Sequence, residues 1–286
     1  MATSFPRFYV SLLAGAMLAI PAQAFDTAPD AKHEQLCLRG PTAAAVSFRG
    51  AVNYDKAGGK AGMMMYPAPG LAGLVAAIAT HAAVSASVRE SEKQKLREES
   101  DAVVAPYLGV LGQYKHEELM RASLVAMKSG GQKRVIPLED ATVAGELLVD
   151  TVPTFYLTQD QRAIIVENAV RIERGTGGTY EKVIRVISPA QDEKAGAGLW
   201  LGNEAALLKA ESARIYAQSL DIAIDDLHAP TERTEPFKTV RYDEGGTEKM
   251  ERAQVIGQQC SHLVLRTLRG DLLAVPRKLS GDGCRS

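Results

Sequence analysis

The sequence predicts an α+β or α/β sandwich, in which an antiparallel meander is covered by helices and a small β-rich module follows at the C-terminal end. Three observations predict this fold class. A long helical stretch precedes a middle region of alternating strands with short connections, which is typical of hairpins. A second long helix follows. The residues after 236 then alternate apolar and polar again. We therefore assign residues 43–230 to a main domain and residues 231–286 to the module.

The composition is that of a globular protein. Hydrophobic residues make up 46% and charged residues 23% of the chain, so it is neither a disordered chain nor a coiled-coil rod. The formal net charge is -1, and acidic and basic residues are interleaved along the sequence. Because no broad basic surface is evident, we expect no nucleic-acid partner.

The first 24 residues are typical of a secretory signal peptide. Arg7 precedes an uncharged apolar run from Phe8 to Ile20, and Ala22-Gln23-Ala24 supplies a small-x-small end. The run is shorter than the roughly 20 apolar residues that a membrane span needs. We expect cleavage after Ala24, a periplasmic location and an irregular lead-in over residues 25–42.

The first half of the main domain is predicted to be mostly helical. Alternating apolar residues indicate a strand from Ala43 to Tyr54. Helical spacing begins at Gly70 and continues through a densely charged stretch to Asp101. Pro106 should break or kink this helix. A second amphipathic helix is expected from Tyr107 to Met127, with Gly130 as its C-terminal stop.

The middle of the chain is predicted to be β-rich. A short strand is expected from Arg134 to Leu138. Leu147 to Leu157 should form a strand at an edge or bulge, because Pro153 interrupts it. The strands Ala163 to Glu173 and Tyr180 to Ser188 complete an antiparallel meander with it.

A long helix and a second group of strands follow the meander. Asn203 is a good N-cap for a helix that ends near Leu227. Turn residues then divide the C-terminal segment into four predicted strands, which cover residues 237–243, 247–256, 260–268 and 272–275.

Three cysteines remain after export: Cys37, Cys260 and Cys284. An oxidising compartment permits disulfides, and the odd count leaves at least one thiol unpaired within the chain. We favour a bridge between Cys260 and Cys284, because both lie in the last segment. A bridge between Cys37 and Cys260 and three reduced thiols are the alternatives.

The stretch from Met63 to Val88 contains no charged residue. Its large apolar side chains keep to one helical face, so a buried packing helix is the favoured interpretation. An oligomer interface through Gly70, Leu74 and Ile78 is the second. Membrane contact is not expected, because alanine and glycine contribute little to insertion.

No catalytic, metal or nucleotide motif stands out in the sequence. The Gly-x-Ser-x-Gly pattern of many serine hydrolases does not occur. Cys260-Ser261-His262 with Cys284 could hold a soft metal, but a structural zinc site needs four ligands, usually more tightly spaced. The run Gly175-Thr176-Gly177-Gly178 has no following lysine, which predicts a hairpin turn and not a phosphate loop. We therefore expect no metal and no cofactor.

Three stretches carry a resemblance to known proteins: Leu96 to Leu111, Val152 to Ile172 ("VPTFYLTQDQRAIIVENAVRI") and Val240 to Pro276. Together they resemble a group of uncharacterised exported proteins of Gram-negative bacteria. The order of elements, with "LTQD" at the turn of the meander, is also similar to the α/β unit of the curli secretion channel family and the TolB amino-terminal domain. The resemblance implies a fold and an export route and assigns no chemistry.

These observations favour an exported, non-catalytic binding or scaffolding protein of the cell envelope, whose partner is an envelope protein or a second copy of the chain. One alternative is a periplasmic hydrolase acting on envelope material, with a site assembled from scattered residues. A weaker alternative is a subunit attached peripherally to the outer membrane.

Overall fold

A computed structural model describes residues 35–52, 88–140, 146–173, 178–192, 196–229, 235–259 and 261–277. Several predictions lie outside these residues: the signal peptide, the interface residues Gly70, Leu74 and Ile78, and the bridge between Cys260 and Cys284. They stay predictions.

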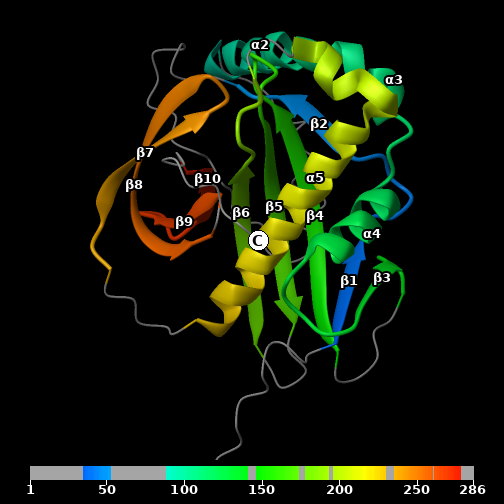
Figure 1. Cartoon of the computed structure of the whole chain (residues 1–286), viewed down its shortest axis with the longest axis vertical. Coiled ribbons are helices and arrows are strands. Elements are labelled where there is room, and N and C mark those ends of the chain that lie inside the picture. The colour runs from blue at the N-terminus through cyan, green and yellow to red at the C-terminus, as the bar shows by residue number, and fades with distance from the viewer. Residues whose placement is uncertain are drawn as a thin grey trace, which may run out of the picture.

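Within the described ranges, one ten-stranded mixed sheet forms the centre of the protein (Figure 1). The strands run in the order β3-β1-β4-β5-β6-β10-β9-β8-β7, and β2 pairs with the far end of β4. Their bounds are β1 Leu36–Gly40, β2 Ser47–Gly50, β3 Lys133–Pro137, β4 Leu147–Leu157, β5 Ile164–Glu173, β6 Thr179–Ile187, β7 Lys238–Glu244, β8 Thr247–Gln258, β9 His262–Thr267 and β10 Leu272–Pro276.

The predicted mixed α+β class is confirmed, and so is the antiparallel meander, which is β4, β5 and β6. Pro153 lies where β4 lacks a partner on one side, because β1 pairs with β4 only up to Asp150 and β2 only from Thr154. A proline without an N–H fits this local edge. The C-terminal strands join the same sheet through β10, which runs parallel to β6.

The irregular lead-in predicted for residues 25–42 is wrong over its last part, because β1 lies there. Leu36, Cys37 and Leu38 are at most 1% exposed, and β1 lies between the parallel strands β3 and β4. A parallel strand buried on both faces has a short continuous apolar run without alternation. Three such residues among polar neighbours give no periodic signal.

The described helices are α2 (Val88–Asp101), the 3-10 helix η2 (Ala102–Tyr107), α3 (Leu108–Leu111), α4 (His116–Ala126) and α5 (Gly196–His228). The expected change at Pro106 is confirmed, because this residue lies inside η2. The single helix predicted from Tyr107 to Met127 is wrong. It is divided at Gly112, and Lys115 is extended and forms a β-bridge with Ala45. None of the described helices is long and apolar enough to cross a membrane.

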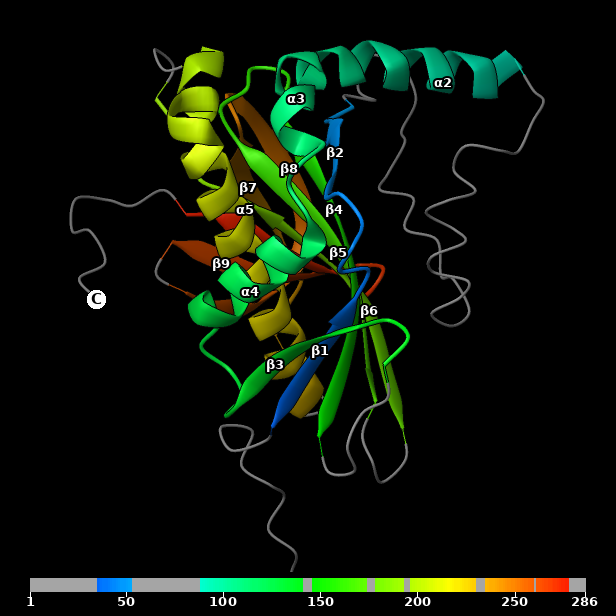
Figure 2. The same cartoon turned by 90° about the vertical axis from the view of Figure 1, so that its right-hand side faces the viewer.

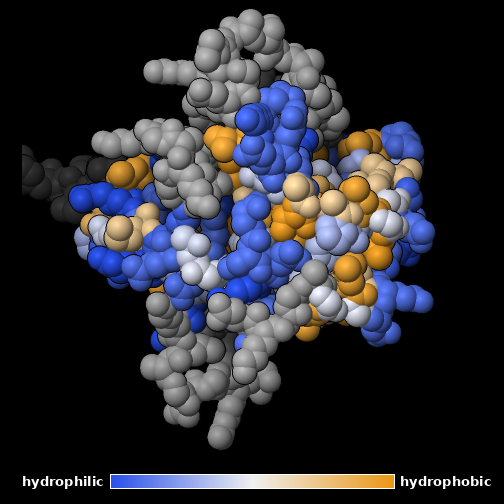
Figure 3. All heavy atoms as spheres, turned by 90° about the horizontal axis from the view of Figure 1, so that it is seen from above, coloured by the Kyte–Doolittle hydropathy of each residue, from blue (hydrophilic) through white to orange (hydrophobic). Residues whose placement is uncertain are grey.

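Helix α5 begins earlier than predicted and contains a kink. Asn203, Glu204 and Ala205 all have positive φ, between 51° and 60°, so Asn203 lies in a left-handed turn between two helical parts. Seen from above, apolar side chains gather around α3 and the first part of α5, where Leu108 is 63% exposed (Figure 3).

Two hydrophobic clusters cover the two faces of the meander. Helices α4 and α5 lie across one face (Figures 1 and 2), and the larger cluster fills the space between them and the sheet. On the other face, Ile165 and Ile187 pack against Val240 and Tyr242 of β7. Since β7 is four strands away from β6 in the sheet, this contact shows that the C-terminal strands curl back over the meander.

Candidate functional site

The turn between β4 and β5, residues 158–163, forms hydrogen bonds with several other parts of the protein; we call it the corner turn. Gln159 Nε2 donates hydrogen bonds to the carbonyls of Ala51, after β2, and Ser100, near the end of α2. Gln161 Oε1 accepts a hydrogen bond from the Tyr107 hydroxyl, and its backbone carbonyl accepts one from Trp200 Nε1. Gln161 has a φ of 56°, which a residue with a Cβ rarely adopts. The two contacts hold it there.

Asp160 connects the corner turn to the hairpin between β7 and β8. Its carboxylate accepts hydrogen bonds from the Thr158 hydroxyl and from the backbone N–H groups of Arg162 and Gly246. Burial alone would raise the pKa of Asp160, but these bonds and the Arg162 charge hold it below its usual value. The contact requires Gly245, which has a φ of 63° and whose Cβ would lie 2.6 Å from Asp160 Oδ1.

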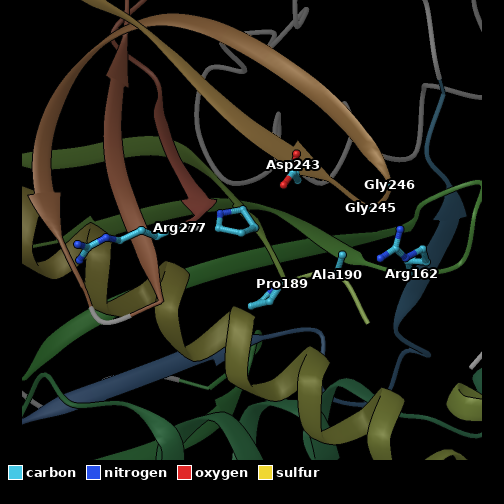
Figure 4. Close-up of a pocket in the computed structure, with 8 residues that line it drawn as sticks. Arg162, Pro189, Ala190, Asp243, Gly245, Gly246 and Arg277 are labelled. Carbon is cyan, nitrogen blue, oxygen red and sulfur yellow. The ribbon is translucent and has the colours of Figure 1, made fainter. Parts of the chain in front are cut away.

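A pocket of about 360 Å³ opens beside the corner turn (Figure 4). This volume falls in the range of small-molecule sites. The lining comes from the corner turn, the segment after β6, the β7–β8 hairpin and the end of β10: Arg162, Pro189, Ala190, Asp243, Gly245, Gly246, Pro276 and Arg277. We call it the corner pocket.

Arg162 is the fixed cation of the corner pocket. Its backbone N–H is bound by Asp160, and its Nε donates a hydrogen bond to the carbonyl of Gln191 at 2.9 Å. Among the described residues, its two Nη groups have no hydrogen-bond acceptor. A guanidinium held at Nε with free Nη groups can bind an oxyanion of a ligand. Arg277 lies at the opposite side and its side chain extends away from Arg162 (Figure 4).

Ser261 and His262 form a serine–histidine contact that is similar to the catalytic pair of a serine hydrolase. The Ser261 hydroxyl lies 2.8 Å from His262 Nδ1, and His262 Nε2 lies 2.8 Å from the Ile187 carbonyl. Because a carbonyl only accepts, Nε2 carries the proton and Nδ1 accepts from the hydroxyl. Burial lowers the pKa of His262 to about 4. Such a weak base is poorly suited to activate a serine near pH 7, so the contact fixes the start of β9.

His262 should make the protein lose stability in acid. Its pKa is lower in the folded protein than in the unfolded chain, so stability is fully present above about pH 6.5 and decreases as the pH falls towards 4. We expect a loss of about 3 kcal/mol over this window. Urea unfolding at several pH values measures it. His262→Gln should have a shallower pH dependence, and an unchanged slope in this variant would contradict the assignment.

No group of three or more His, Cys, Asp or Glu residues in the described ranges could hold a metal ion. Cys37 is buried and is a free thiol within the described part of the chain, and burial raises its pKa. Arg162 and Asp243 were not predicted as site residues, because the local sequence pattern around them predicts only a turn and a strand. The adjacent glycines at 245 and 246 were the one available signal for a close backbone approach.

Comparisons with known protein families, with curated proteins and with solved structures found no match. The resemblance to exported proteins of Gram-negative bacteria therefore stays a prediction.

Proposed function

We propose that this chain is an exported, non-catalytic binding or scaffolding protein of the cell envelope and that the corner pocket is its ligand site. The observation that carries the proposal is Arg162: a guanidinium held in place by the corner turn, with both Nη groups unpaired among the described residues, on the wall of a pocket. In this proposal the fold is the predicted sandwich, and the predicted C-terminal module of residues 231–286 supplies one wall of the site.

The hydrogen-bond partners of other polar side chains support a binding role. Asn168 is fully buried and bonds to the hydroxyls of Thr151 and Ser219, so this cluster joins β4, β5 and α5 in the core. Ser261 and His262 bond to each other and to the backbone. Each of these groups has a structural partner, whereas the two Nη groups of Arg162 have no hydrogen-bond acceptor within the described part of the chain and lie at a ligand-sized space.

The periplasmic location rests on the signal peptide predicted for residues 1–24. The partner is an envelope protein or a second copy of the chain, and Gly70, Leu74 and Ile78 are the proposed interface residues. Neither the proposed location nor the proposed partner requires a metal, a cofactor or a nucleic acid.

In-cell crosslinking of the tagged full chain, followed by mass spectrometry, tests the proposal. We expect a reproducible envelope partner or a homo-oligomer. Arg162→Gln should lower its yield several-fold, because the guanidinium donors are lost from the ligand site. The matched control is Arg241→Gln on β7, because Arg241 is exposed and, within the described ranges, its ion pair is with Glu248 on the adjacent strand β8.

Two results would contradict a non-catalytic binding role. One is a lone monomer without a crosslinked partner, with no effect of Arg162→Gln. The other is hydrolysis of an envelope polymer that Ser261→Ala abolishes. The second result would favour the hydrolase alternative, with Ser261 as its nucleophile.

A further inference from the structure

The corner pocket has a positive wall at Arg162 and a negative wall at Asp243, and the side chain of Arg277, which also lines the pocket, extends away from Arg162. Arg162 comes from the corner turn and Asp243 from β7, near the hairpin, and Figure 4 shows them on different sides of the space above Ala190. A carboxylate has about four acceptor positions, so Asp243 can accept from a ligand in addition to its contacts within the protein. A ligand that satisfies both walls therefore carries an anion and a donor cation.

Part of the pocket lining is apolar. Pro189, Ala190 and Pro276 form this part, and these residues offer no side-chain hydrogen bond. Gly245 and Gly246 add no side chain beside Asp243 on the hairpin side, and a Cβ at Gly246 would lie 3.0 Å from Arg162 Nη1. The space between the two charges thus accepts a short hydrocarbon or backbone segment.

We propose that the corner pocket binds a small zwitterion of the amino-acid or short-peptide class. Its carboxylate pairs with the Nη groups of Arg162, its ammonium group with Asp243, and its small side chains lie on the prolines. A free phosphate suits the pocket less well, because its second negative charge would meet Asp243. This inference rests on the proposed function, since it names the ligand of that same site.

Isothermal titration of the purified full chain with four probes tests the ligand class. The probes are alanyl-alanine, its N-acetyl form, its C-terminal amide and inorganic phosphate. We expect alanyl-alanine to bind. Removal of either terminal charge should weaken binding at least about tenfold, because a charge-assisted hydrogen bond is lost. Phosphate should also bind more weakly.

Two variants assign the charges to their partners. Arg162→Gln should abolish the preference for alanyl-alanine over its amide, and Asp243→Asn the preference over the acetylated form. Arg241→Gln is the matched control and should retain all affinities within about twofold. Arg162 and Asp243 both lie at structural contacts, so thermal unfolding confirms that each variant folds. Arg162→Lys gives a second variant, which retains the charge and loses the two-pronged geometry.

The outcomes separate the ligand class from the function. Tighter binding of phosphate, equal binding of the three peptides, or no binding at millimolar concentration would overturn the zwitterion inference. If none of the probes binds but Arg162→Gln still lowers in-cell crosslinking, the proposed function stands without this ligand. If alanyl-alanine binds with the expected preferences but the chain has no envelope partner, the ligand class stands and the scaffolding role falls.

Discussion

Replacing Trp200 by alanine is expected to lower the free energy of unfolding by about 3 to 5 kcal/mol. Trp200 is the only tryptophan of the chain and is fully buried in the larger hydrophobic cluster. The substitution leaves a large cavity at the first part of α5. It also removes the hydrogen bond from Nε1 to the Gln161 carbonyl, so the strained residue of the corner turn loses its contact with α5.

Urea unfolding followed by circular dichroism measures this effect, because the variant has no tryptophan fluorescence. Trp200→Phe is the matched control. It retains most of the apolar volume and loses the hydrogen bond, so we expect a loss of about 1 to 2 kcal/mol. Equal losses in both variants would contradict a packing role for the indole. A loss below about 1 kcal/mol for Trp200→Ala would contradict the anchoring of the corner turn.

Local patterns in the sequence were sufficient for much of the secondary structure. The strands β5 and β6 alternate clearly, and Pro153 correctly indicates a strand with a missing partner. Where tertiary contacts decide, the patterns fail. The break at Gly112 is stabilised by the bridge between Lys115 and Ala45, 70 positions apart, and no local propensity encodes such a pairing.

The candidate site could not be predicted from the sequence for the same physical reason. The bond from Gly246 to Asp160 joins residues 86 positions apart, and it exists only because the sheet curls. Each segment by itself is an ordinary turn, with polar residues and glycine in expected places. That the Nη groups of Arg162 have no acceptor among the described residues is likewise a property of the folded surroundings, which the local sequence does not encode.

The curl of the sheet should depend on the ion pairs of Arg185. Arg185 of β6 pairs with Glu167, its direct neighbour on β5, and with Glu244 of β7 at 2.9 Å. Glu244 belongs to a strand four places away in the sheet, so this side chain ties the curled edge to the meander. Burial by itself would lower the pKa of Arg185, but Glu244 and Glu167 raise it above its usual value.

Arg185→Met should therefore lower the free energy of unfolding by about 3 kcal/mol at neutral pH, because it leaves two mostly buried carboxylates without their cation. The matched control adds Glu167→Gln and Glu244→Gln to the same chain. It removes the unpaired charges and should restore most of the lost free energy of unfolding. The reason is that a buried ion pair contributes little more stability than neutral groups of similar size. Urea unfolding of both variants decides between the two origins of stability. If the triple variant is no more stable than Arg185→Met, the arginine acts through packing of its side-chain stem and not through the two carboxylates.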